Sequence, residues 1–218
     1  MEEQLQHPPT LSYLLRKFWR LREVYSKDRL AEILISTNCV KFGEFILSSG
    51  AKSNVYVDMR KIISHPAEFM ELIRIYTRMV SNLKFDILAG VESGGIPFAT
   101  AIGVELKKPI IYVRKEYKNH GLKKLIEGEF KERDIALVID DVSTTGSSIA
   151  RAVEVLKSNN LIVYDAFVIV DREEGAREKL QQLNIKLHYL ITLKEIISLM
   201  SYQASMPYTK EIRGKPHE

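Results

Sequence analysis

The sequence predicts an α/β fold, with an open, mainly parallel central sheet flanked by helices and a small N-terminal strand-containing hood. Three observations lead to this prediction. Five continuous apolar runs follow residue 84, and such runs are typical of strands buried on both faces. Helical segments separate several of the runs, and strand–helix–strand repetition produces right-handed crossovers in a parallel sheet. Two shorter strand-like stretches precede them around a Ser-Gly turn, which is the expected hood.

The first predicted element is an amphipathic helix within residues 11–34. Apolar residues recur there at helical spacing with basic residues between them, namely Leu11, Leu14, Leu15, Phe18 and Leu21. This helix could pack on the domain or on a partner subunit, or it could be a basic arm for nucleic acid or anionic lipid. Apolar residues and Glu23 interrupt the positive charges, which favours packing.

The hood is predicted at residues 42–60, as two short strands around a Ser-Gly turn. A helix follows and begins at Pro66, because proline is favoured in the first turn of a helix. Met70, Ile73, Thr77 and Val80 share one face of this helix.

The strands of the central sheet are predicted at 85–91, 110–113, 135–140, 166–170 and 188–193, and the intervening helices at 95–107, 147–158 and 175–183. Ligands of such sheets bind at the carboxyl ends of the strands. The expected organisation is a helical basic extension at 1–29, one domain at 30–200 and a weakly structured tail at 201–218.

Composition limits the possible function classes. The chain has 218 residues and a net charge of +4, which suits one soluble domain and makes nucleic acid an improbable partner. A single cysteine, Cys39, cannot form an internal disulfide, so a reducing, cytoplasmic location is expected. The polar start is unlike a signal peptide, and no apolar run approaches membrane-spanning length.

One apolar strand leads directly into paired acids and hydroxyls. Asp140 and Asp141, the acid pair, are followed by residues 143–148, Ser-Thr-Thr-Gly-Ser-Ser, the hydroxyl turn. Hydroxyls and amides at the start of a helix are suited to a monophosphate, and the absence of a lysine after Gly146 argues against a triphosphate P-loop. The acids would meet ribose hydroxyls, directly or through a hydrated Mg²⁺. The alternative is a strand end beside a capped helix, but two buried acids would be costly without a purpose.

Residues 112–128, the basic loop, carry a dense set of cations. They are Arg114, Lys115, Lys118, His120, Lys123 and Lys124. The segment is too polar and too long to be a mere connector, so it is interpreted as a clamp for a highly anionic group. A solvated surface loop is the alternative.

Two of these segments resemble a known family. The stretch VIDDVSTTGSS is similar to the phosphoribosyl diphosphate signature of type I phosphoribosyltransferases, and the basic loop closely resembles the mobile catalytic loop of orotate phosphoribosyltransferases. The resemblance implies that the acid pair binds the ribose hydroxyls and that Lys118 and His120 contact the diphosphate. It also implies a homodimer in which loop 114–121 reaches the neighbouring active site. The residues expected around the phosphoribosyl diphosphate are Arg114, Lys115, Lys118, His120, Asp140, Asp141, Val142, Ser143, Thr144, Thr145, Gly146, Ser147 and Ser148.

Three further segments agree with this resemblance. Residues 41–60 resemble the segment that covers the base, with Tyr56 and Val57 near the base-stacking position. The segment VDREEGA resembles one whose arginine pairs with the orotate carboxylate, which implies that role for Arg172; a surface salt bridge with Glu173 or Glu174 is the alternative. The segment GVESGGIPFAT resembles the turn under the diphosphate.

The chain departs from the family pattern at several positions. Ser93 and Gly94 stand where some members have tyrosine and lysine. Ser48 stands where many have a lysine, so one diphosphate contact is either absent or made by Lys52. The basic extension before Leu30 lies outside the pattern.

The implied activity is transfer of phosphoribosyl from phosphoribosyl diphosphate to orotate with Mg²⁺ as cofactor, a glycosyltransferase step of pyrimidine biosynthesis. Lys118, His120, Asp140 and Asp141 are the expected catalytic residues, and the metal is expected to be held mainly by substrate. Two alternatives remain. A purine phosphoribosyltransferase would give Arg172 no carboxylate to bind, and a phosphoribosyl diphosphate sensor acting on nucleic acid would not need the basic loop.

Overall fold

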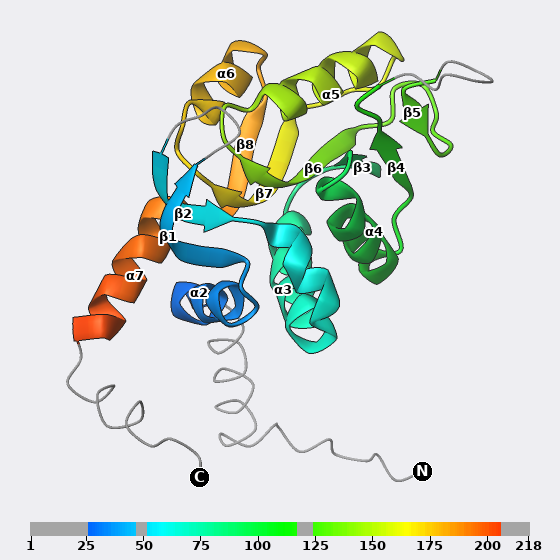
Figure 1. Ribbon diagram of the computed structural model, residues 1–218. Coiled ribbons are helices and arrows are strands. Elements are labelled where there is room, and N and C mark those ends of the chain that lie inside the picture. The colour runs from blue at the N-terminus through cyan, green and yellow to red at the C-terminus, as the bar shows by residue number, and fades with distance from the viewer. Residues whose placement is uncertain (1–25, 47–51, 117–123, 206–218) are drawn as a thin grey trace, which may run out of the picture.

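The computed structural model describes residues 26–46, 52–116 and 124–205. Its main sheet has six strands in the order β5-β4-β3-β6-β7-β8 (Figure 1). Five of them are parallel, and the two-residue β5 is antiparallel at one edge. The strands are β3 (Ile87–Val91), β4 (Ile110–Val113), β5 (Ile126–Glu127), β6 (Ala136–Ser143), β7 (Asp165–Asp171) and β8 (Lys186–Thr192). The predicted fold class is therefore confirmed.

Helices cover both faces of the sheet (Figure 1). The helices α3 (Pro66–Val80) and α4 (Gly95–Leu106) lie on one face, and α5 (Ser147–Ser158) and α6 (Ala176–Gln182) on the other. The side chains of β6 alternate between two cores, because Leu137 packs with α3 and α4 whereas Val138 packs with α5 and α6. Burial on both faces explains why the strands read as continuous apolar runs.

The sheet order identifies where a ligand site forms. After β4 and the edge strand β5, the chain crosses to the other side of β3 and continues as β6. The loops that leave β3 and β6 therefore run in opposite directions, which opens a crevice at the carboxyl ends of these two strands.

Strand β6 is longer than its apolar run. It was expected to end at residue 140, but it continues through Ser143. Pairing with β7 explains the extension, because Val142 lies opposite Val170 and Ser143 opposite Asp171. The acid pair therefore lies within strand β6 rather than in a loop, and Asp140 is paired with Val168 of β7.

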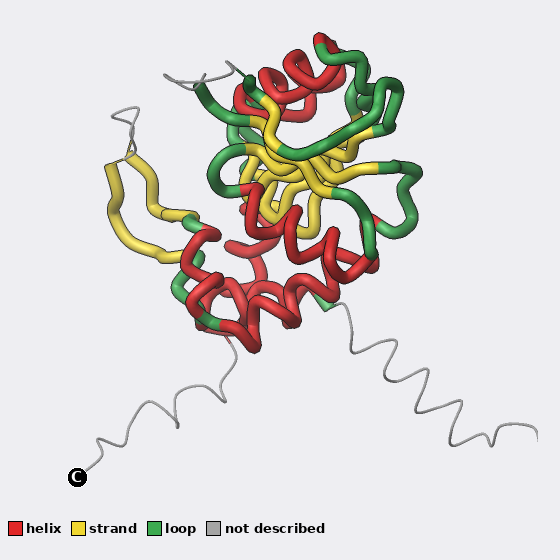
Figure 2. The backbone as a smooth tube through the Cα atoms, turned by 90° about the vertical axis from the view of Figure 1, so that its right-hand side faces the viewer, coloured by secondary structure: helices red, strands yellow, loops and turns green. Residues whose placement is uncertain are grey.

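The hood is a separate two-stranded antiparallel sheet of β1 (Val40–Ile46) and β2 (Lys52–Val57), as predicted. Figure 2 shows this hairpin projecting from the body of the molecule. A 3₁₀ helix, η1 (Met59–Ser64), connects β2 to α3, and Met59 and Ile62 anchor it in the core.

The first described helix is α2 (Lys27–Ser36), capped by Ser26. It runs across the expected boundary between an extension at 1–29 and the domain, a division that stays a prediction. Residues 11–25 of the predicted amphipathic helix lie outside the described residues.

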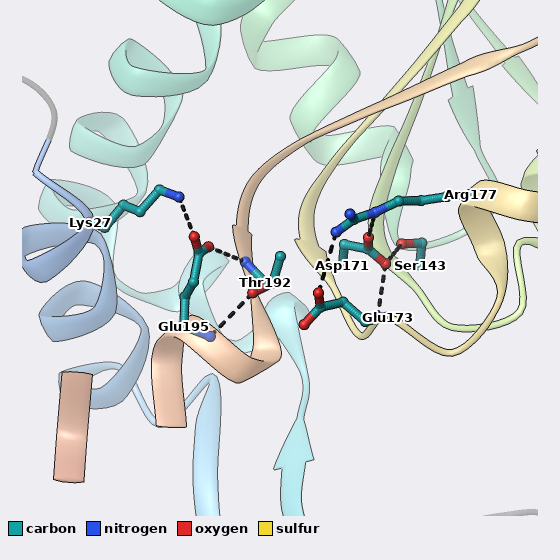
Figure 3. A network of polar contacts seen from close by, with 7 residues as sticks. All are labelled: Lys27, Ser143, Asp171, Glu173, Arg177, Thr192 and Glu195. Carbon is teal, nitrogen blue, oxygen red and sulfur yellow. Dashed lines mark hydrogen bonds and ion pairs between the residues drawn. The ribbon is translucent and has the colours of Figure 1, made fainter. Parts of the chain in front are cut away.

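The last helix, α7 (Leu193–Ser205), enters the segment from 201 that was expected to be weakly structured. That expectation was wrong for residues 201–205. Reciprocal capping starts the helix: the Glu195 N–H donates to Thr192 Oγ1 at 3.1 Å, and the Glu195 carboxylate accepts from the Thr192 N–H at 2.9 Å. Lys27 of α2 pairs with the same carboxylate (Figure 3). Among the described helices, none combines the length and the apolar character needed to cross a bilayer.

Candidate active site

The hydroxyl turn forms a small cradle at the start of α5. Gly146 has a φ of +73°, and a Cβ placed on it would lie 3.1 Å from Ala176 Cα. A side chain at this position would be strained in conformation and crowded against Ala176. The hydroxyls of Thr145 and Ser147 lie 3.0 Å apart. A cavity of about 90 Å³ is lined by Asp140 and residues 142–149, so the structure brings one acid and the turn together.

The acid pair is held by its own backbone. Asp140 Oδ1 accepts from the Asp141 N–H, and Asp141 Oδ1 accepts from the Val142 N–H, each at 2.9 Å. Burial raises the pKa of Asp140 well above its usual range, and the negative charge of Asp141 raises it further. Burial also raises the pKa of Asp141, although hydrogen bonds and the charge of Arg60 oppose this. Keeping both carboxylates ionised in this desolvated position therefore costs free energy in the ligand-free protein.

Helix α4 begins directly against Asp141. A Cβ on Gly94 would come within 2.5 Å of the Asp141 carboxylate, and one on Gly95 within 2.2 Å of the Ile139 carbonyl oxygen. Only glycine allows this approach. Gly94 is the N-cap of α4, so the carboxylate lies beside the positive end of the helix dipole.

A larger cavity of about 680 Å³ joins three predicted segments. It lies between the end of β3, the described start of the basic loop and the first turn of α5, and it is lined by Glu92, Ser93, Arg114, Lys115, Glu116, Ser147, Ser148 and Arg151. Cations and hydroxyls on one concave surface suit a polyanion.

Two residues that the sequence analysis did not identify fix the start of the basic loop. Arg151 Nη1 donates to the carbonyl oxygens of Arg114, at 3.1 Å, and Lys115. The Glu92 carboxylate accepts from the Lys115 N–H. These hydrogen bonds join side chains to main-chain groups that are 23 to 37 positions away in the sequence. No local motif therefore predicts the roles of Arg151 and Glu92. Lys118 and His120 lie outside the described residues.

Arg172 makes one of the two salt bridges considered as alternatives. Its Nε donates to Glu174 Oε1 at 2.8 Å, and its side chain is only 10% exposed. The Arg172 N–H donates to the Ser143 carbonyl oxygen at 3.0 Å, which ties this residue to the hydroxyl turn. Its role toward a carboxylate substrate stays a prediction.

A buried hydrogen-bond network centred on Asp171 supports the hydroxyl turn (Figure 3). Asp171 is fully buried and accepts from Ser143 Oγ at 2.9 Å, from the Glu173 N–H at 3.0 Å and from Arg177 Nε at 2.6 Å. The Arg177 guanidinium also lies 4.4 Å from the centre of the Tyr189 ring. Asp171 stands inside the quoted VDREEGA motif, but nothing in the motif indicates that its partners are Ser143 and Arg177.

Several residues of the hood have predicted roles in binding the base or the diphosphate. Tyr56 lies between the Phe45 ring, at 5.5 Å, and the Lys61 ammonium, at 5.9 Å from its centroid. Val57 packs against the larger core, and Lys52 is exposed at the start of β2. Ser48 lies outside the described residues. The base-binding roles of this segment remain predictions.

Comparison with known proteins identifies the family. Residues 59–186 match the phosphoribosyl transferase domain. Orotate phosphoribosyltransferases of Pyrococcus abyssi and Methanocaldococcus jannaschii are 39% and 43% identical to this chain over 176 and 173 residues. These matches cover 78% and 79% of this chain and 94% and 97% of theirs. The chain belongs to the orotate phosphoribosyltransferase family.

Solved structures agree with this family assignment. An orotate phosphoribosyltransferase from Aeropyrum pernix superposes with a TM-score of 0.70 at 35% identity, over 79% of this chain and 99% of that one. The UMP synthase of Leishmania donovani superposes with a TM-score of 0.75 at 33% identity, over 87% of this chain but 41% of the longer protein. The expected membership of the orotate phosphoribosyltransferase family is therefore confirmed.

Proposed function

We propose that the protein is a pentosyltransferase that transfers phosphoribosyl from phosphoribosyl diphosphate to a nitrogen of orotate. The products are orotidine monophosphate and diphosphate, in the synthesis of UMP. One observation carries the proposal: the acid pair, the hydroxyl turn and the start of the basic loop converge on the switch point of the sheet. The curated relatives with orotate phosphoribosyltransferase as their name support the choice of base.

Each part of the site has a role in this reaction. The amides and hydroxyls of residues 143–148 bind the 5′-phosphate at the positive end of α5. Asp140 and Asp141 accept from the ribose hydroxyls and stabilise the positive charge that develops on the sugar as its anomeric bond breaks. Arg114 and Lys115, with Lys118 and His120, neutralise the departing diphosphate. Orotate is already an anion, so the reaction needs no strong general base.

The residues present fit a magnesium ion bound mainly through substrate. Among the described residues there is no group of three or more His, Cys, Asp or Glu side chains that could hold a metal. Mg²⁺ commonly takes only one or two carboxylates together with substrate phosphates and water, and the acid pair provides that donor set. The substrate would supply most of the ligands, and Asp140 and Asp141 would hold the ion through water. When bound, it would neutralise charge on the diphosphate.

A homodimer and a cytoplasmic location are part of the same proposal. The resemblance of loop 114–121 to a loop that acts across subunits supports the dimer. Cys39 is a buried free thiol, and a single cysteine suits a reducing compartment. A net charge of +4 gives little support to nucleic acid as a partner.

The proposal is tested by mixing the protein with Mg²⁺, orotate and phosphoribosyl diphosphate and following orotate absorbance. A steady fall that requires all three components is expected. Turnover with hypoxanthine or adenine in place of orotate would instead identify a purine enzyme, in which Arg172 has no carboxylate partner. No turnover with any base would reject the enzyme in favour of a sensor.

The contact between Gly94 and Asp141 provides a prediction about substrate affinity. Gly94→Ala should displace the Asp141 carboxylate, because the new methyl group would overlap it, and should raise the KM for phosphoribosyl diphosphate about tenfold, a loss of about 1.4 kcal/mol. A double-mutant cycle with Asp141→Ala checks the cause. If Gly94→Ala still raises the KM for phosphoribosyl diphosphate tenfold when residue 141 is already alanine, overlap with the Asp141 carboxylate is not the reason.

A further inference from the structure

Helix α6 packs directly on the hydroxyl turn. Gly146 of the turn approaches Ala176 so closely that a Cβ would lie 3.1 Å from Ala176 Cα. The ion pair between Arg177 Nε and Asp171 Oδ2, at 2.6 Å, anchors the first turn of α6 from the other side. These contacts fix the backbone of α6 relative to the turn.

One side chain of α6 is a cation that reaches the turn. Lys179 Nζ donates to Ser147 Oγ at 2.7 Å, and Ser147 Oγ lies 3.0 Å from Thr145 Oγ1. A hydroxyl that accepts from an ammonium keeps its own proton free to donate, and the ammonium keeps two further donors. The contact thus orients two hydroxyls and places a positive charge beside them.

We propose that Lys179 is a 5′-phosphate-binding residue in addition to the hydroxyl turn. This rests on the proposed function of the turn. The ammonium would donate directly to a phosphate oxygen while it holds Ser147 as a donor to the same phosphate. A dianionic phosphate gains more from a nearby ammonium than from neutral donors alone. The side chain comes from outside the motif, 32 residues from Ser147.

The test compares Lys179→Met with a matched variant, Lys186→Met. Methionine keeps an unbranched stem and removes the charge. Lys186 is an exposed lysine at the start of β8, at the opposite end of the sheet from the turn. For Lys179→Met we expect a KM for phosphoribosyl diphosphate that is about tenfold higher, a kcat within about twofold and an unchanged KM for orotate. Lys179→Arg should recover most of the affinity, and Lys186→Met should behave as the parent protein.

Calorimetric titration with ribose 5-phosphate separates this inference from the proposed function. The Kd of ribose 5-phosphate should rise by about the same factor in Lys179→Met, whether or not orotate is turned over. If the parent protein binds ribose 5-phosphate but does not transfer phosphoribosyl from phosphoribosyl diphosphate to any base, the proposed function is rejected, and the change in Kd still tests the role of Lys179. A Kd and KM unchanged in Lys179→Met, or raised equally in Lys186→Met, would overturn the role of Lys179.

Discussion

Asp140→Asn is expected to abolish most activity and at the same time to stabilise the free protein. The Asp140 side chain is buried, and both burial and the Asp141 charge raise its pKa. The folded state therefore disfavours the ionised form that the reaction needs. Asparagine keeps an oxygen that can accept from the Asp141 N–H but carries no charge. We expect kcat/KM to fall by about 10² or more and the free energy of unfolding to rise by about 1–2 kcal/mol.

The pH dependence of stability checks the cause. A carboxyl whose pKa is higher in the folded state binds its proton more tightly there, so stability falls as pH rises from the ordinary aspartate pKa through the raised one. The stability advantage of Asp140→Asn in denaturant unfolding should therefore be larger at neutral pH than at about pH 4, where it should shrink toward zero. A constant advantage across this range, or no advantage at neutral pH, would contradict the assignment. If Asp140→Asn lowers kcat/KM but does not raise the free energy of unfolding, the ionised acid pair does not destabilise the folded protein.

Asp171→Ala is expected to cause the largest loss of stability. The substitution removes the acceptor of three buried or half-buried donors, on Ser143, Glu173 and Arg177. Asp171 is fully buried but the Arg177 side chain is 40% exposed, so the loss of this ion pair and of two further hydrogen bonds should cost about 2–4 kcal/mol. The loss should reach the active site too, because Ser143 begins the hydroxyl turn and Arg177 anchors α6. Urea unfolding and the KM for phosphoribosyl diphosphate measure the two effects.

Ser143→Ala serves as the matched control. It removes one of the three hydrogen bonds to Asp171 but leaves the other two, so it should cost only about 1 kcal/mol. Equal losses in the two variants would show that the hydroxyl, and not the ion pair, carries the network. A loss below about 1 kcal/mol in Asp171→Ala would contradict the importance of the buried pair.

The order of the elements could be predicted because local periodicity determines it. The boundaries of β4 and α5 agree with the predicted runs at 110–113 and 147–158. Periodicity was less informative where tertiary partners extend an element. Strand β6 continues to Ser143 because β7 pairs with it, and α7 continues past residue 200 from a start that Thr192 and Glu195 cap.

The candidate site also contains residues that short motifs reveal and residues that only the tertiary structure reveals. The acid pair, the hydroxyl turn and Arg114 and Lys115 form short motifs, so their chemistry is visible in neighbouring residues. The supporting residues are not, because Arg151 acts on main chain 36 and 37 residues away and Lys179 on a hydroxyl 32 residues away. Nothing in their own sequence surroundings specifies those partners.

By itself, the sequence determined the fold class, the positions of the hydroxyl turn and the acid pair, and the family, because these depend on local patterns of polarity and on contiguous motifs. Only the tertiary structure decided how the acids are desolvated and which side chains hold the turn and the start of the basic loop. The physical reason is that burial, pKa and long-range hydrogen bonds arise from residues that meet only after the β3–β6 crossover has formed.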